Sequence, residues 1–131
     1  MMVLDTSAVI AILFAEPAAG RLEYAILDAT RPALSAASLV ETGIVAVARR
    51  GEAMEREVPL LLRRLRVEIV PVTVAHAEEA LDVFRRFGKG RHPAALNFGD
   101  CFSYALARAL GEPLLFVGED LVQTDIDIAP Y

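Results

Sequence analysis

Four positions spread along the chain carry acidic side chains in one shared sequence context. Each follows a short apolar segment or opens a helical pattern, and the residues are Asp5, Glu41, Asp100 and the pair Glu119 and Asp120. The carboxyl ends of parallel strands gather at one edge of a sheet, so these carboxylates can converge although they are distant in sequence. Capping explains each acid singly, but Ser, Thr or Asn would cap as well, so four carboxylates favour a functional cluster.

Carboxylates that converge need a cation between them. Without one they repel each other, and each raises the pKa of its neighbours. Oxygen ligands without a Cys or His cluster favour Mg²⁺ or Mn²⁺ over zinc. His76 lies in mid-helix and His92 precedes a proline in a loop, and neither has the spacing of a zinc motif. The pattern therefore predicts a Mg²⁺ or Mn²⁺ site formed by acidic residues.

The remaining reactive side chains have simpler interpretations. Cys101 is the single cysteine, so it forms no internal disulfide, and its helical context predicts a small core residue and not a nucleophile. His76 is expected at the surface of a helix or partly buried there. For His92 the sequence leaves two roles open, loop structure and substrate contact.

Composition and charge narrow the class of protein. With 131 residues, 55% of them apolar, and no linker, residues 1–131 are expected to form a single domain. The longest apolar run is far shorter than the roughly 20 residues of a membrane-spanning helix, so we expect a cytoplasmic protein without membrane contact. A net charge of −5 argues against broad coating of nucleic acid, but it is compatible with a nuclease that holds cations in an acidic pocket.

Segments typical of strands and helices alternate along the chain. Strands are expected over residues 2–4, 33–36, 67–72, 113–117 and 125–128, with 67–72 as the clearest. Helices are expected over residues 6–15, 18–28, 38–50, 52–65, 74–87 and 98–110. Ser38 and Glu41 fit a capping box, and Pro59 is expected to kink or divide its helix. The alternation predicts an α/β domain with a mainly parallel sheet and helices on both faces.

Four stretches of the sequence resemble a known family. They are Met2 to Ala8, Ser38 to Glu41, Gly90 to Phe102 and Leu114 to Ile126. Together they are similar to the PIN-domain ribonucleases, and within these to the VapC-type toxins of toxin–antitoxin pairs. The resemblance covers essentially the full length. It implies a three-layer α/β/α domain, Mg²⁺- or Mn²⁺-dependent endoribonuclease activity, a homodimer, and inhibition by a VapB-type antitoxin that inserts a segment near the active site.

The resemblance also assigns roles to the acids. Asp5, Glu41 and Asp100 match the three firmest metal-site acids of the family, and Asp120 matches the fourth, with Glu119 beside it as an alternative. Phosphodiester hydrolysis needs an activated water and a stabiliser for the charge on the phosphate, and a carboxylate-bound divalent ion supplies both. Asp5 and Asp100 would bind the ion directly, and Glu41 would bind it or act through a water. Thr6 or Ser7 matches a small hydroxyl residue that helps orient the site.

Basic residues near Asp100 are candidates for substrate contact. Lys89 and Arg91, with His92 beside them, lie on the loop before Asp100 and are the expected contacts to RNA phosphates, with a solvated loop as the alternative interpretation. Two other functions stay open from the sequence. One is a PIN-like binding module that has lost catalysis, against which the four intact acids argue. The other is a DNA-directed nuclease, since no residue reads out a 2′-hydroxyl.

Overall fold

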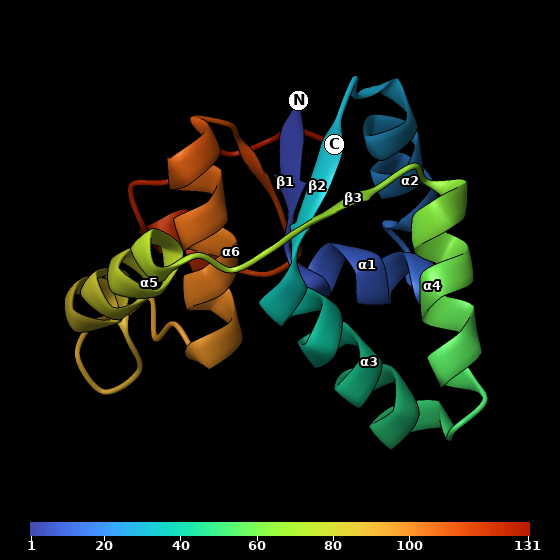
Figure 1. The fold of residues 1–131 in the computed structure, drawn as a ribbon, viewed down its shortest axis with the longest axis horizontal. Helices are drawn as coiled ribbons and strands as arrows, with labels where there is room; N and C mark the ends of the chain where they lie inside the picture. The colour runs from blue at the N-terminus through green and yellow to red at the C-terminus, as the bar shows by residue number, and fades with distance from the viewer.

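A four-stranded parallel sheet forms the centre of the protein (Figure 1). In the computed structural model, which describes residues 1–131, the strand order is β3-β2-β1-β4. The strands are β1 (Met2–Leu4), β2 (Pro32–Ser35), β3 (Glu68–Val70) and β4 (Leu114–Leu115). Val3 pairs with Ala33 on one side and with Leu114 on the other. The central strand β1 therefore delivers Asp5 to the middle of the carboxyl edge of the sheet.

Six helices cover the two faces of the sheet (Figure 1). They are α1 (Thr6–Leu13), α2 (Ala19–Asp28), α3 (Ala36–Arg50), α4 (Met54–Arg64), α5 (Val74–Phe87) and α6 (Phe98–Leu110). A short 3₁₀ helix, η1 (Leu121–Gln123), follows β4. Helices α5 and α6 lie on one side, and α1 to α4 lie on the other. The predicted three-layer α/β/α architecture with a parallel sheet is confirmed.

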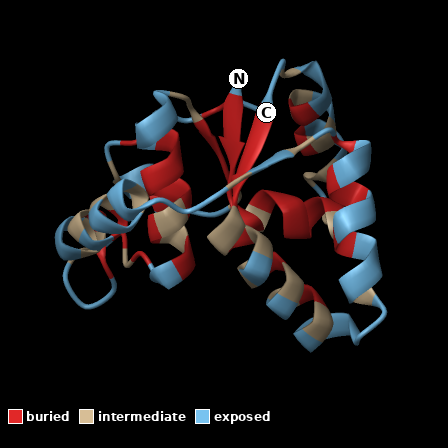
Figure 2. Ribbon diagram, viewed as in Figure 1, coloured by how far each residue is buried: buried red, intermediate tan, exposed pale blue.

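The alternation of side chains along the strands separates two apolar cores. Leu4 and Leu34 pack with α1 to α4, whereas Val3 and Ala33 pack with α5 and α6. All four are essentially inaccessible to solvent, as expected for parallel strands covered on both faces. Figure 2 shows the consequence, buried strands β1 and β2 between helices whose outer faces are exposed, with the edge strand β3 left accessible to solvent. None of the helices combines the length and the apolar character that crossing a bilayer requires.

Two of the strands are shorter than the sequence predicted. Within residues 67–72, only Glu68–Val70 form a strand, β3. This strand lies at the edge of the sheet and has β2 as its single neighbour. The segment 113–117 pairs with β1 only at Leu114–Leu115, at the opposite edge. The predicted strand over 125–128 is wrong, since this segment makes only an isolated bridge between Leu114 and Ile128.

Two details of the helices also differ from the prediction. Helix α3 begins at Ala36 and its cap is Ser35, whose hydroxyl accepts a hydrogen bond from the Ala37 N–H at 3.2 Å. The predicted capping box of Ser38 and Glu41 is therefore wrong, and both residues lie inside the helix. Pro59 does not divide α4, which is continuous from Met54 to Arg64. The helix continues because Pro59 lies on its exposed face, where water can satisfy the carbonyl that lacks an N–H partner.

Candidate active site

Asp5 is the most tightly held acid of the structure. Its side chain is 4% exposed, and it caps the N-terminus of α1. Oδ2 accepts hydrogen bonds from the Ser7 N–H at 3.0 Å and the Ser7 hydroxyl at 2.6 Å, and Oδ1 accepts one from the Ser103 hydroxyl at 2.6 Å. The Ser7 hydroxyl also accepts a bond from the Val117 N–H at 2.9 Å. The Asp5 carboxylate is therefore oriented by partners from α1 and α6. The chain after β4 is connected to it through the Ser7 hydroxyl.

Buried hydroxyl groups hold the three helices around Asp5 together. The Thr42 hydroxyl donates to the Ser38 carbonyl at 2.7 Å, and the Thr6 hydroxyl donates to the same carbonyl at 3.3 Å. The Ser38 and Ser103 hydroxyls lie 3.3 Å apart. No buried side-chain nitrogen or oxygen lacks a hydrogen-bond partner. Helices α1, α3 and α6 are thus joined by polar contacts that fix where their acids lie.

Asp5, Glu41 and Asp100 line one small cavity of about 160 Å³. We call it the acid cavity, and its remaining lining residues are Thr6, Ser7, Ile10, Val45, Arg49 and Asn97. Glu41 comes from the second turn of α3, and Asp100 comes from the first turn of α6. Three of the acids that the sequence singled out therefore share one cavity at the carboxyl edge of the sheet. Thr6 and Ser7 line it with them.

The acids of this cavity influence one another's ionisation. Burial raises the pKa of Asp100 to about 7, and the charges of Asp5, Glu41 and Asp120 add to this, against a hydrogen bond from the Asn97 N–H at 3.0 Å. The pKa of Glu41 is also raised, mainly by burial and to a smaller extent by the charge of Asp5. The neighbouring Thr6 hydroxyl lowers the pKa of Glu41 in part. The cluster without a cation therefore tends to hold a proton near neutral pH.

The pair Glu119 and Asp120 is exposed at the start of η1. The charge of Asp120 contributes to the raised pKa of Asp100, whereas that of Glu119 does not. Of the pair, Asp120 is therefore the member whose charge acts on Asp100, although neither residue lines the acid cavity. Its side chain makes no hydrogen bond to cap η1, so capping does not explain the carboxylate at this position.

The donor set fits a hard divalent cation. The acid cavity offers carboxylate and hydroxyl oxygens and no His or Cys, which matches Mg²⁺ or Mn²⁺. No three His, Cys, Asp or Glu side chains are arranged as ready ligands of one ion in this structure. Asp5 is fixed by Ser7 and Ser103, and Asp100 accepts a hydrogen bond from the Asn97 N–H, whereas Glu41 reaches the cavity on a longer side chain. A cation between them would offset the repulsion that raises their pKa values.

The structure adds two residues that the sequence analysis missed. Ser103 lies three residues after Asp100 on α6 and donates to Asp5. Arg49 lines the acid cavity from α3, where Glu41, Val45 and Arg49 follow one another at intervals of four residues on one face. The signal that would have identified both is helical spacing from an acidic residue, i+3 from Asp100 for Ser103 and i+8 from Glu41 for Arg49.

The expected substrate contacts do not line the acid cavity. Lys89 and Arg91 are exposed on the loop between α5 and α6, and neither forms a salt bridge. His92 has a structural role in the same loop, because its Nδ1 accepts a hydrogen bond from the Ala94 N–H at 3.0 Å. Its ring also packs edge-on against Phe87 at 5.0 Å.

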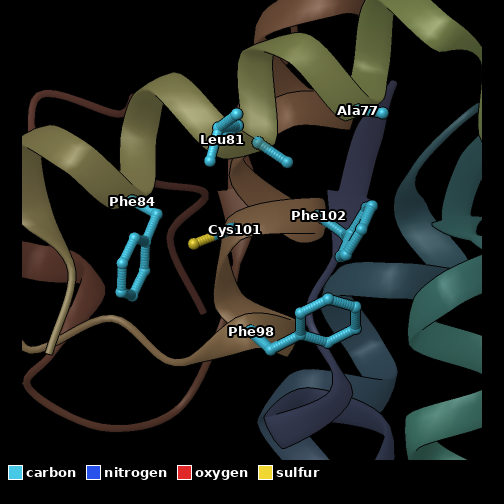
Figure 3. Close-up of a pocket in the computed structure, with 7 residues that line it drawn as sticks. Ala77, Leu81, Phe84, Phe98, Cys101 and Phe102 are labelled. Atoms are coloured by element: carbon cyan, nitrogen blue, oxygen red, sulfur yellow. The ribbon is translucent and has the colours of Figure 1, made fainter.

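An apolar groove runs beside the acids. Its first part is a pocket of about 310 Å³ between α5 and α6, lined by Ala77, Ala80, Leu81, Phe84, Phe98, Cys101 and Phe102 (Figure 3). A second depression shares Phe98 and Phe102 and continues to Val40, Ile44, Glu41 and Asn97. Glu41 and Asn97 also line the acid cavity, so the apolar groove ends at the acids.

Cys101 belongs to the wall of the apolar groove and to the core. Its side chain is 3% exposed, and burial raises the pKa of its thiol to about 11. A thiol with this pKa is protonated at neutral pH and is a poor nucleophile. The interpretation of Cys101 as a core residue is confirmed.

Comparison with known proteins identifies the family. The PIN domain family matches residues 2–127. The protein named Ribonuclease VapC of Mycolicibacterium smegmatis is 51% identical over 125 residues, which cover 95% of this chain and 97% of the relative. The chain belongs to the VapC ribonucleases of the PIN domain family. The ribonuclease interpretation of the sequence is confirmed, and neither an inactive binding module nor a DNA-directed nuclease is favoured.

Solved structures of toxins share the fold of this VapC-family domain. Mycobacterium tuberculosis VapC20, described as a Sarcin-Ricin loop cleaving toxin, superposes with a TM-score of 0.78 at 18% identity. The superposition covers 99% of this chain and 100% of VapC20. A toxin–antitoxin complex from Klebsiella pneumoniae gives a TM-score of 0.76 at 17% identity over 100% of this chain and 98% of that chain.

Gly99 gives a selective way to displace Glu41. A Cβ at Gly99 would lie 2.0 Å from Glu41 Oε2, whereas the helical backbone of Gly99 accepts alanine. Only the flexible end of Glu41 has to move, so we expect Gly99→Ala to keep the melting temperature and to lower RNA cleavage by about tenfold. Gly43→Ala on α3 is the matched control, because a Cβ there meets nothing within 4 Å. Equal cleavage by the two variants would show that Glu41 is dispensable.

The raised pKa of Asp100 predicts how stability depends on pH without metal. Its pKa is about 7 in the fold against an ordinary 3.8, so between these values the folded protein holds a proton that the unfolded chain releases. The free energy of unfolding in chelator should therefore fall as the pH rises from about 4 to about 7. Urea denaturation at both ends of this window measures it. Asp100→Asn should reduce the fall, and an unchanged pH dependence in that variant contradicts the assignment.

Proposed function

We propose that this chain is a Mg²⁺- or Mn²⁺-dependent endoribonuclease whose ion is held by Asp5, Glu41, Asp100 and Asp120. One observation carries the proposal, namely that acids from β1, α3 and α6 share the acid cavity and influence one another's pKa. Family membership supports ribonuclease activity, and the all-oxygen donor set supports the choice of metal.

When bound, the divalent ion activates a water and stabilises the charge that grows on the phosphate oxygens. Asp5 provides a ligand whose direction is set by Ser7 and Ser103 before any ion arrives. Glu41 has a raised pKa, so it is suited to accept the proton that the attacking water loses. Thr6 supports Glu41, and Glu119 adds negative charge beside Asp120.

We assign the contact with the reacting phosphate to Arg49. It lines the acid cavity, its side chain is exposed, and it forms no salt bridge, so its N–H groups are available to a phosphate. The guanidinium groups of Arg49 and Arg50 both lie over the Phe14 ring. Their central carbons are 5.8 Å and 4.4 Å from the centre of the ring. Lys89, Arg91 and the free Nε2 of His92 are proposed to contact RNA farther along the strand.

The proposal is tested by incubating the purified protein with RNA and with single-stranded DNA, in Mg²⁺, in Mn²⁺ and in chelator. We expect cleavage of RNA only, abolished by chelator and lowered by Asp5→Asn about a thousandfold or more, because Asp5 is the most buried acid and is oriented by three hydrogen bonds. Circular dichroism verifies that the variant is folded. An Asp5→Asn variant that cleaves like the wild type overturns the assignment.

Two adjacent arginines provide a matched comparison in the same assay. Arg49→Gln should lower cleavage by about tenfold to a hundredfold, because an arginine–phosphate contact in the cavity is lost. Arg50→Gln removes the same charge from the next position, which does not line the acid cavity, and should have a small effect. Similar losses in both variants would mean that Arg49 acts only through general electrostatic attraction.

Two partners complete the proposed function. We propose that the protein is a single PIN domain acting in the cytoplasm as a homodimer, and that a VapB-type antitoxin covers the apolar groove. The groove exposes Phe98 to 78% and Ile44 to 64% and ends at the acidic residues Glu41 and Asp100. It therefore suits a segment whose apolar side chains bind along the groove and whose basic residue reaches the acids. The toxin–antitoxin complex from Klebsiella pneumoniae supports a partner of this kind.

Phe98 distinguishes the antitoxin from the homodimer as the occupant of the apolar groove. Phe98→Ala should weaken antitoxin binding about tenfold or more in calorimetry, as expected for an aromatic anchor. Leu27→Ala is the control, because Leu27 is 52% exposed on α2 and lies outside the groove. Light scattering should show an unchanged oligomeric state for Phe98→Ala. A dimer that dissociates while antitoxin affinity persists would assign the groove to the second copy instead.

A further inference from the structure

The chain after β4 carries Asp120, yet little regular structure holds it. Strand β4 has only two residues, and η1 has only three. We call residues 116–128 the C-terminal segment. Leu121 and Ile126 bury their side chains in the core beside α6, and between them lies a polar attachment at Asp125. Asp125 belongs to a stretch that the sequence analysis quoted, but the proposed metal site gives it no role.

Asp125 is contacted by three residues of the helices beneath it, of which Arg108 of α6 is the most distant, with its Nη1 3.9 Å from Asp125 Oδ2. The Tyr104 hydroxyl of α6 donates a short hydrogen bond to Asp125 Oδ1. Arg86 of α5 has Nη1 3.5 Å from Asp125 Oδ2, and its Nη2 donates to the Tyr104 hydroxyl at 3.4 Å. Arg86, Tyr104 and Asp125 therefore form a closed set of contacts, which we call the clasp. It connects α5, α6 and the C-terminal segment.

The helical half of the clasp is arranged independently of the C-terminal segment. Arg86 Nε donates to Asp82 Oδ2 at 3.0 Å, one turn earlier on α5, and its guanidinium carbon lies 5.2 Å from the centre of the Phe87 ring. The Tyr104 ring is fully buried. Burial raises the pKa of Tyr104, and the hydrogen bond from Tyr104 lowers the pKa of Asp125, so the donor stays neutral and the acceptor stays ionised.

The connection from Asp125 back to Asp120 is short and internally bonded. The Thr124 hydroxyl donates to the Leu121 carbonyl at 2.7 Å and accepts from the Ile126 N–H at 3.3 Å. The Gln123 N–H also donates to the Asp120 carbonyl at 3.2 Å. A segment fixed at Asp125 is therefore also fixed at Asp120, because few free rotations separate the two residues.

Asp120 itself has no means of holding its position. Its side chain forms no hydrogen bond and no salt bridge, and it is exposed. Tyr104 lies one turn after Asp100 on the same helix, so the clasp attaches the segment of Asp120 to the helix that presents Asp100. We propose that the clasp of Arg86, Tyr104 and Asp125 positions Asp120 beside the acid cavity. This role rests on the proposed function, in which Asp120 binds the ion.

The clasp residues are positioning residues, and their removal should loosen the segment before it changes the chemistry. Tyr104→Phe removes only the hydroxyl and Asp125→Asn only the charge. In the metal-free protein, both should speed hydrogen exchange of the amides in residues 118–126. Both should also weaken Mn²⁺ binding about tenfold, a size typical of residues that orient metal ligands. Tyr24→Phe is the matched control, because Tyr24 is 74% exposed on α2 and its hydroxyl forms no hydrogen bond within the chain.

A double-mutant cycle with Asp120→Asn shows whether the clasp acts through Asp120. In the Asp120→Asn background, Tyr104→Phe should cause no further loss of Mn²⁺ affinity. An equal loss in both backgrounds, or unchanged exchange of residues 118–126 in Tyr104→Phe and Asp125→Asn, overturns the proposal. If the wild-type protein fails to cleave RNA, the proposed function is wrong, while the exchange measurement still decides whether the clasp holds the segment.

Discussion

The structure depends on the need to satisfy a buried carboxylate at the end of the central strand. Asp5 is 4% exposed, and a buried charge is stable only with several hydrogen bonds or a cation. Its donors come from Ser7 and Ser103, and Ser7 in turn bonds the chain after β4 at Val117. Meeting this one requirement brings together β1, α1, α6 and the end of β4. The same contacts that stabilise the fold therefore build the site.

Helix α6 transmits this order to the other acids. Asp100 lies in its first turn and lines the acid cavity, Ser103 bonds Asp5, and Tyr104 bonds Asp125 in the C-terminal segment. Because these residues are three and four positions apart, one rigid helix sets the spacing of three carboxylates from distant parts of the chain. Gly99 of the same helix makes room for a further acid, because the absence of a side chain there leaves the space that the Glu41 carboxylate occupies. Burial and like charge raise the pKa values of Asp100 and Glu41. Holding ionised carboxylates in this cluster therefore costs free energy, and stability of the fold does not account for their presence.

Much of the fold was predictable, because it follows from local patterns. The order of helices along the chain and the parallel sheet with two covered faces agree with the sequence. The errors lie where tertiary partners decide. Residues 67–72 have strong strand propensity, but they lie at an edge and pair over three residues only. Ser38 has the sequence context of a helix cap, but the cap of α3 is Ser35. Ser38 lies inside the helix, where its buried hydroxyl contacts that of Ser103.

For the site, the sequence by itself determined which acids are candidates, because residue type and position after a strand are local properties. It identified Asp5, Glu41 and Asp100, all of which line the acid cavity. Only the tertiary structure showed the charge of Asp120 acting on Asp100 and Ser103 orienting Asp5. It also placed Arg49 in the wall of the acid cavity and Lys89 and Arg91 outside it. The physical reason is that short-range chemistry fixes what each residue can do, whereas distances across the chain arise from the packing of helices on the sheet. No local pattern encodes those distances.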